Sequence, residues 1–389
     1  MTSLVATVKT ANGVDKSVRR VVELAGGIDI KRGESVLIKP NMSCAKPSGS
    51  GLVTSVEVVA SLVRLVKDAG GQPLVGDLPI VGWDPEETYR TIGMEKAVTH
   101  AGGQFVDFSR DEAVTIHIPN AKVMNKVKVV KTALTVDKIV SVAVFKPHFF
   151  TGMSLCIKNL KGLTWQDQRT KIHVIGLYDP IIDLFQVFKD KVIFGLVDGT
   201  VGSESVRSSG PYFGPTEGKP LKLDMLIAGK DLVAVDAVSE RIAGLNPSEV
   251  KLTKLAHARG LGEVKDVKLV GDRISPRLLS QSFLGRILQV IQPFWTSRYT
   301  NPLVHPLAKV LGGPKIQTFH TVERDLRSSR VGSIILAGNC DGCGVCVKSC
   351  KMNNISIEKG VPRINNQSCF RCLICVEVCP KGALALSRV

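Results

Sequence analysis

The chain has 389 residues, 44% hydrophobic residues and a formal net charge of +16 at pH 7. This length and composition indicate a globular protein of two or three domains and exclude an intrinsically disordered chain. Because the sequence has neither an uncharged apolar run of about 18 residues nor a signal-peptide pattern, we expect no transmembrane helix and no secretion.

Strands and helices alternate along residues 1–271, which we call the body. The predicted strands, rich in β-branched and apolar residues, cover residues 4–9, 35–39, 73–76, 104–108, 138–145, 192–197, 223–228 and 267–270, with a β-rich stretch at 114–134. The predicted helices, most of which stop at glycine, cover residues 18–25, 55–69, 85–100 and 231–243. This alternation predicts an α/β fold in which helices cover both faces of a parallel or mixed sheet. A division into two lobes, 1–137 and 138–271, is an alternative.

Residues 272–330 differ from the body and form a predicted basic helical connector. They contain nine Arg or Lys residues, three Asp or Glu residues and five prolines. One interpretation is that this connector packs the C-terminal part onto the body. The other is that its amphipathic stretch, 278–299, makes peripheral contact with a membrane or an acidic partner.

Eight cysteines dominate residues 331–389, which we call the tail and predict to be a small α+β ferredoxin-like domain. They form two runs with the spacing C-x2-C-x2-C-x3-C, at Cys340, Cys343, Cys346 and Cys350 and at Cys369, Cys372, Cys375 and Cys379. This spacing is typical of bacterial ferredoxins with two [4Fe–4S] clusters, in which the fourth cysteine of each run ligates the other cluster. We therefore expect cluster I to be held by Cys340, Cys343, Cys346 and Cys379, and cluster II by Cys369, Cys372, Cys375 and Cys350.

Zinc is the alternative metal, because paired C-x2-C motifs also form zinc sites. Four cysteines in each run, both ending in the x3 step, favour the iron–sulfur interpretation. One departure from the ferredoxin pattern is Lys351, which stands where proline usually follows the fourth cysteine. A positive charge there would raise the potential of cluster II. Thiolate ligands also require a reducing compartment, so we expect a cytoplasmic protein without disulfides.

Five short motifs in the body together resemble the DUF362 family. They are Lys39–Asn41, Phe145–His148, Leu155–Gly162, Val197–Gly199 and Gly229–Asp236. The resemblance covers about residues 5–270 and implies an α/β body, often followed by a ferredoxin module. It implies no reaction, so the chemistry depends on the residues themselves.

Several polar residues follow predicted core strands, where open parallel sheets bind ligands. We expect Lys39, Asn41, Lys146, His148, Lys158 and Asn159 to converge there and to bind a carboxylate or phosphate. Lys39, Asn41 and Asn159 are candidate substrate-binding residues. The loop Gly210–Gly218 could close over them. The alternative is that these side chains only cap strand ends and satisfy turn carbonyls.

Candidate catalytic residues in the body are His148, Lys146, Lys158 and Asp198. His148 would act as a general acid, since its ordinary pKa is near neutral. Asp198 and Asp236 would orient lysines or bind a metal, and Glu204 is a further acid candidate. Cys44 and Cys156 could form a redox dithiol, although cysteine is more often a small buried apolar residue.

These patterns predict an iron–sulfur redox protein that passes electrons to an anionic substrate in the body, as a ferredoxin-linked oxidoreductase would. The alternative is a non-catalytic electron-transfer or cofactor-maturation subunit. Both need a redox partner protein. Nucleic acid is not favoured as a partner, because no aromatic-rich basic motif accompanies the positive charge.

Overall fold

The computed structural model describes residues 2–275 and 333–386, apart from short gaps at 81–82, 149–150, 166–167, 170–171, 173–176, 204–219, 337, 339, 351–352, 367–368, 370–373 and 378. Glu204, the loop Gly210–Gly218, Cys372 and the stretch 278–299 therefore lie outside the described residues. No helix in the described ranges is both long enough and apolar enough to cross a membrane.

A single mixed sheet of eight strands forms the centre of the body, in the order β12-β1-β11-β10-β7-β2-β3-β4. Its strands are β1 (Ser3–Lys9), β2 (Ser35–Lys39), β3 (Gln72–Val75), β4 (Gln104–Phe105), β7 (Lys138–Val144), β10 (Val192–Ser203), β11 (Pro220–Gly229) and β12 (Val267–Gly271). β11 is antiparallel to both of its neighbours, and every other adjacent pair is parallel. The α/β prediction is confirmed.

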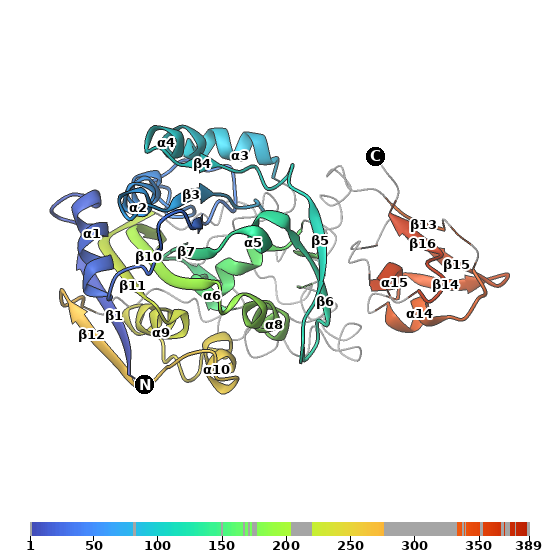
Figure 1. Cartoon of the computed structure of the whole chain (residues 1–389). Coiled ribbons are helices and arrows are strands. Elements are labelled where there is room, and N and C mark those ends of the chain that lie inside the picture. The colour runs from blue at the N-terminus through green and yellow to red at the C-terminus, as the bar shows by residue number, and fades with distance from the viewer. Residues whose placement is uncertain are drawn as a thin grey trace, which may run out of the picture.

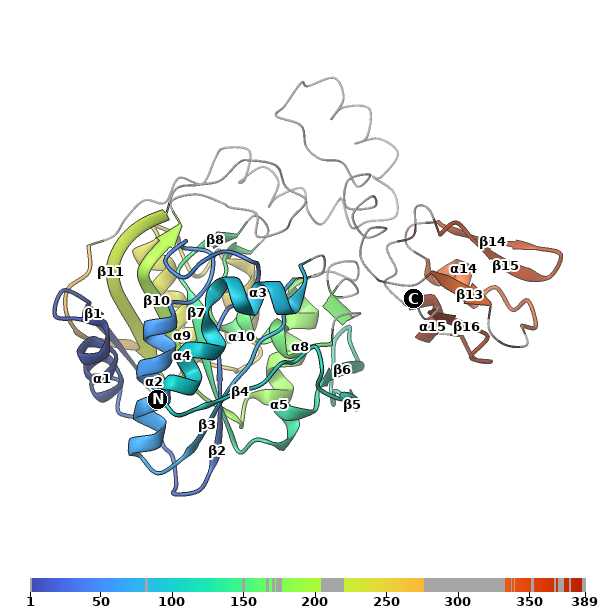
Figure 2. The same ribbon diagram turned by 90° about the horizontal axis from the view of Figure 1, so that it is seen from above.

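Helices cover both faces of this sheet (Figures 1 and 2). The helices on one face are α1 (Val14–Leu24), α2 (Val56–Asp68), α3 (Pro85–Ile92) and α4 (Met94–His100), and those on the other are α6 (Cys156–Asn159), α8 (Tyr178–Phe188), α9 (Leu232–Ile242) and α10 (Lys251–Ala258). Side chains of a strand alternate between the faces. Thus Val36 and Ile38 pack in the first core, whereas Leu37 packs in the second.

The structure differs from two of our expectations about the body. The predicted helix at 85–100 is two helices, because Gly93 adopts a left-handed conformation (φ 76°) that ends α3 and begins α4. The alternative division into two lobes is not seen, because β2 from the first half pairs directly with β7 from the second half.

The β-rich stretch forms a separate antiparallel pair, β5 (Ala113–His117) with β6 (Lys126–Val130). The short helix α5 (Lys131–Thr135) leads from it into β7. A second small pair, β8 (Pro147–His148) with β9 (Gly152–Met153), follows β7. A one-turn 3-10 helix, η1 (Leu160–Leu163), then continues directly from α6. β8, β9 and the α6–η1 turn thus follow the carboxyl end of β7.

The tail contains two antiparallel pairs and two short helices. β13 (Ile334–Leu336) pairs with β16 (Leu384–Leu386), and β14 (Ile355–Glu358) pairs with β15 (Val361–Ile364). The helices α14 (Val345–Ser349) and α15 (Ile374–Glu377) each follow cysteines of one run. Its buried core consists of Ile334, Cys346, Ile355, Cys375 and Leu384.

Candidate functional site

Parallel strands β2, β3 and β7 end at one edge of the sheet, and their ends supply the polar residues of the site. Lys39 is the last residue of β2, whereas Asp77 and Lys146 each follow a strand by two residues. The α6–η1 turn supplies Lys158 and Asn159. The structure therefore brings together Lys39, Asn41, Lys146 and Asn159 as the sequence predicts, with their side chains in direct contact.

Lys39 forms a fully buried ion pair. Its ammonium contacts Asp77 Oδ1 at 2.7 Å, Asn159 Oδ1 at 3.1 Å and the Pro40 carbonyl at 3.0 Å. Burial lowers the pKa of Lys39, and the Asp77 carboxylate opposes this effect. Because this ammonium is fully buried among a carboxylate, an amide oxygen and a backbone carbonyl, Lys39 acts inside the protein and is not exposed to a ligand.

Lys146 is used in the same way, although no carboxylate pairs with it directly. It donates to Asn41 Oδ1 at 3.0 Å, Ser43 Oγ at 3.0 Å and the Leu52 carbonyl at 2.6 Å. Burial lowers its pKa to about 8, with a smaller contribution from the nearby Lys39. Lys39 and Lys146 therefore tie the loops of this edge together, as the strand-end alternative proposed.

The α6–η1 turn packs closely on the buried ion pair. Asn159 donates to the Lys39 carbonyl at 3.0 Å, and a Cβ at Gly162 would lie 2.1 Å from Asp77 Oδ1 and 2.4 Å from Lys39 Nζ. The buried Arg169 also holds the turn in place, because it donates to the Gly162 carbonyl at 2.9 Å and to the Leu78 carbonyl at 2.5 Å. The position of the turn is thus fixed by the ion pair.

Lys158 and Lys161 lie three residues apart on this turn, a spacing that places side chains on one helical face. Both are half-buried, unlike Lys39 and Lys146. The one hydrogen bond that the structure describes for Lys158 is long, 3.4 Å to Ser154 Oγ. Burial, followed by repulsion from Lys146, Arg169 and Lys39, lowers the pKa of Lys158 to about 7. Burial and repulsion from Lys158 also lower the pKa of Lys161 well below its usual range.

The two aspartates that the sequence suggested as catalytic or metal-binding residues contact backbone amides instead. Asp198 accepts from Ser55 N at 2.7 Å and from Thr200 N at 2.9 Å, and Ser55 is the N-cap of α2. Asp236 accepts from Cys156 N at 2.8 Å and from Ile157 N at 3.0 Å at the start of α6. These contacts give both carboxylates a structural role. The structure describes no contact between Asp198 and Lys146 or Lys158.

His148 lies on β8, and its Nδ1 accepts a hydrogen bond from Thr151 N at 3.2 Å. In the neutral ring the proton is then on Nε2, whereas a general acid needs the doubly protonated ring, in which Nδ1 no longer accepts this bond. That role stays a prediction.

Cys44 and Cys156 are both fully buried, but they belong to the hydrophobic cores on opposite faces of the sheet. The predicted dithiol between them is therefore wrong. In addition, no three His, Cys, Asp or Glu side chains of the described residues converge on a single metal ion; the cysteines of a [4Fe–4S] cluster differ in that each binds its own iron.

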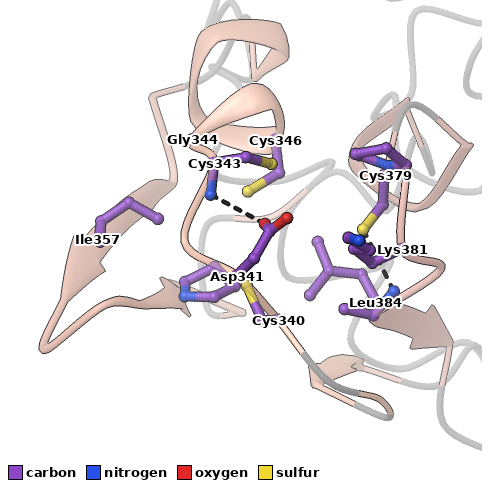
Figure 3. Close-up of a pocket in the computed structure, with 12 residues that line it drawn as sticks. Cys340, Asp341, Cys343, Gly344, Cys346, Ile357, Cys379, Lys381 and Leu384 are labelled. Carbon is purple, nitrogen blue, oxygen red and sulfur yellow. Dashed lines mark hydrogen bonds between the residues drawn. The ribbon is translucent and has the colours of Figure 1, made fainter.

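In the tail, four cysteines from both runs line one pocket (Figure 3). They are Cys340, Cys343, Cys346 and Cys379, the ligand set expected for cluster I. Backbone amides point at two of these sulfurs, from Gly342 to Cys340 at 3.4 Å and from Ala383 to Cys379 at 3.2 Å. Such N–H···S bonds stabilise thiolate ligands of iron–sulfur clusters. Burial raises the pKa of Cys379, but hydrogen bonds from Ala383 and Lys381 outweigh it, so the net shift is downward. The donor set therefore fits a [4Fe–4S] cluster.

Of the cysteines expected for cluster II, Cys375 lies in the hydrophobic core of the tail, and Cys350 and Cys369 are partly buried and pack against that core. The amide of Asn354 points at the sulfur of Cys350 at 3.4 Å. This packing is compatible with a second cluster, while Cys372 lies outside the described residues.

The site also contains three residues that we did not predict: Asp77, Lys161 and Arg169. Asp77 could have been found, because it follows a predicted strand in the same way as Lys39 and Lys146. Lys161 lies inside the Leu155–Gly162 motif, three residues after Lys158, which is a helical spacing. Arg169 gave no signal, since it follows no strand and belongs to none of the motifs.

Known proteins resemble both parts of the chain. A family model described as "Domain of unknown function (DUF362)" matches residues 36–241, and a model of a 4Fe-4S dicluster domain matches residues 339–383. The thylakoid-associated protein sll1697 of Synechocystis sp. is 26% identical over 297 residues, which cover 69% of this chain and 88% of that protein.

Among solved structures, the lactate racemase apoprotein from Thermoanaerobacterium thermosaccharolyticum is 18% identical, with a TM-score of 0.38. The match covers 62% of this chain and spans 57% of the length of that one. Because the first family model spans more than half of the residues, the chain belongs to the DUF362 family and carries a 4Fe–4S domain at its C-terminal end.

Proposed function

We propose that this protein transfers electrons through two [4Fe–4S] clusters to an anionic ligand, a carboxylate or phosphate, held beside Lys158 and Lys161. The 4Fe–4S domain supports electron transfer. Cysteine thiolates from both runs would hold the clusters, which supply one-electron redox chemistry when they are bound.

The main support for binding of an anionic ligand is an excess of positive charge at the carboxyl ends of the parallel strands. Lys39, Lys146, Lys158, Lys161 and Arg169 form this group, which we call the cation cluster. Asp77 is the one carboxylate that the structure describes in contact with it. Burying like charges together is costly unless an opposite charge joins them. An anion bound at the half-buried lysines would reduce this repulsion.

Within this group, the proposed roles differ. Lys158 and Lys161 would bind the anion, while Lys39, Asn41, Lys146 and Asn159 hold the surrounding loops in place. His148 would donate a proton as charge develops on the ligand. The proposal places the protein in a reducing, cytoplasm-like compartment. Peripheral membrane contact through 278–299 remains part of the proposal, and it is compatible with a relative described as thylakoid-associated.

Anion binding is tested by calorimetry with two probes, inorganic phosphate and oxalate. We expect Lys158→Met to weaken binding about 10-fold or more, because a charge-assisted hydrogen bond contributes about 1.5–3 kcal/mol. The matched control is Lys189→Met, which removes an exposed lysine of the body and should leave affinity unchanged. Lys146→Met should instead lower the stability of the body, because three acceptors lose their donor.

The redox half is tested separately. Purified anaerobically, the protein should contain about eight iron atoms per chain, and a reducible anionic metabolite should reoxidise the dithionite-reduced form, whereas phosphate and oxalate serve only as binding probes. The proposal of an anionic ligand is wrong if neither probe binds the wild type, or if Lys158→Met binds the probes as tightly as Lys189→Met does. About four irons, or zinc, would contradict the two clusters.

A second candidate is a non-catalytic electron-transfer or cofactor-maturation subunit. The burial of Lys39 and Lys146 among protein acceptors favours it, because a candidate substrate-binding residue and a candidate catalytic residue then serve only to join loops. Two clusters without anion binding, together with a stable complex with a redox partner, would support this candidate over the first.

A further inference from the structure

The two cysteine runs carry different charges between their first two cysteines. Asp341-Gly342 separates Cys340 from Cys343, whereas Phe370-Arg371 separates Cys369 from Cys372. The residues after the fourth cysteines differ as well, with Lys351 after the first run and Pro380 after the second. The carboxylate of the first run therefore has no counterpart in the second.

The structure places this carboxylate at the cluster I pocket. Asp341 lines the pocket together with Cys340, Cys343, Cys346 and Cys379, and Figure 3 shows its side chain turned towards Cys343. Its Oδ1 accepts a hydrogen bond from Cys343 N at 3.2 Å, which fixes its orientation. Lys381 lines the same pocket, and its positive charge acts on Asp341.

A fixed negative charge beside a redox centre disfavours the form that has gained an electron. Asp341 should therefore make the cluster in this pocket harder to reduce, and Lys381 should partly offset it. The second run carries Arg371 and no acid between its first two cysteines, and Lys351 follows Cys350, the expected cluster II ligand from the first run, so cluster II should be easier to reduce.

We propose that Asp341 sets cluster I at a lower reduction potential than cluster II, so that electrons enter the tail at cluster I and move downhill to cluster II. Cys343, a ligand of cluster I, is exposed, which gives an external donor access on that side. The inference rests on the two clusters of the proposed function.

The test is a reductive titration of the anaerobic holoprotein, followed by EPR. The wild type should show two reduction waves. Asp341→Asn keeps the side-chain oxygen that accepts from Cys343 but removes the charge, so the lower wave should move to higher potential while the other stays. Lys381→Gln should move the same wave in the opposite direction, and the double variant should return it towards the wild-type position.

Glu358→Gln is the matched control, because it removes a carboxylate of the tail that does not line the pocket. It should leave both waves in place. Two waves that Asp341→Asn leaves unmoved, or moves equally, overturn this inference and leave the two clusters intact. The inference also fails if Glu358→Gln shifts the lower wave as far as Asp341→Asn does. A single wave, with about four irons per chain, overturns both the inference and the two-cluster proposal.

Discussion

At Gly162 the backbone lies directly against the buried Lys39–Asp77 ion pair. Only a residue without a side chain leaves room for both charged groups, since a Cβ would overlap Asp77 Oδ1 and Lys39 Nζ. The glycine that closes the Leu155–Gly162 motif is therefore explained by close packing. No left-handed backbone conformation is involved, because Gly162 is not among the glycines with positive φ.

Gly162→Ala should destabilise the body by about 1–3 kcal/mol, because the ion pair or the turn must move to admit a methyl group. A urea unfolding curve of the body measures this change through the midpoint. Because the same turn carries Lys158, the variant should also bind the anion probes more weakly. A midpoint equal to that of the wild type would contradict this account of the motif.

The sequence was sufficient to predict that several polar side chains gather at one site, but it did not indicate Arg169, and the hydrogen bonds of the site could not be predicted. The position of Lys39, Lys146 and Asn159 relative to strands and motifs indicated one location. Whether a lysine keeps a donor for a ligand depends on its acceptors. For Lys146 one of these is the Leu52 carbonyl, which a distant loop brings into reach.

The α6–η1 turn concentrates titratable lysines in one element. In the folded chain the pKa of Lys146 is about 8 and that of Lys158 about 7, whereas an unfolded lysine has 10.5. Between about pH 7 and pH 10 the unfolded chain therefore binds more protons than the folded chain. These lysines therefore contribute a rise in stability with pH across this window, which the raised pKa values of the buried Cys156 and Glu240 oppose.

We accordingly expect the unfolding midpoint of the ligand-free body to increase from pH 7.5 to pH 9, and Lys158→Met to reduce the slope. Anion affinity should change in the opposite direction, because an anion binds the protonated lysines and is lost as they deprotonate. Asp236 contributes little to the pH dependence of stability in this range. Burial raises its pKa to about 7, so it destabilises the fold as pH rises towards 7 and adds no slope above that. A midpoint that falls between pH 7.5 and 9 would contradict the assignment.

Elements with a strong local pattern were predicted well, and those set by tertiary contacts were not. β2, β7 and α2 follow apolar periodicity and capping residues, so their bounds agree with prediction within one or two residues. The direction of β11 could not be read, because parallel and antiparallel core strands have the same composition. α8 and α10 were missed, although α8 buries one whole apolar side.

The body and the tail differ greatly in the size of their hydrophobic cores. The body has two extended cores, one on each face of its sheet, whereas in the described part of the tail five residues form the core and two of these are cysteines. Small domains with so little buried apolar surface usually depend on bound metal for folding. The body should be stable without the tail's metal.

Removing iron with a chelator should therefore unfold the tail and leave the body folded. Limited trypsin digestion with mass spectrometry checks this: cleavage after Lys348 and Arg363 should appear only in the cluster-free protein, and body fragments should persist in both samples. If the cluster-free tail resists trypsin as well as the loaded tail does, its fold does not depend on the metal.

The first and last strands of the body are neighbours, since β1 pairs with β12 in parallel. All eight strands that the structure describes in this sheet therefore precede residue 272, and none of them comes from the tail. A C-terminal module can therefore be gained, lost or exchanged during evolution without refolding what precedes it. The ferredoxin-type domain is best regarded as an interchangeable attachment on a self-contained scaffold.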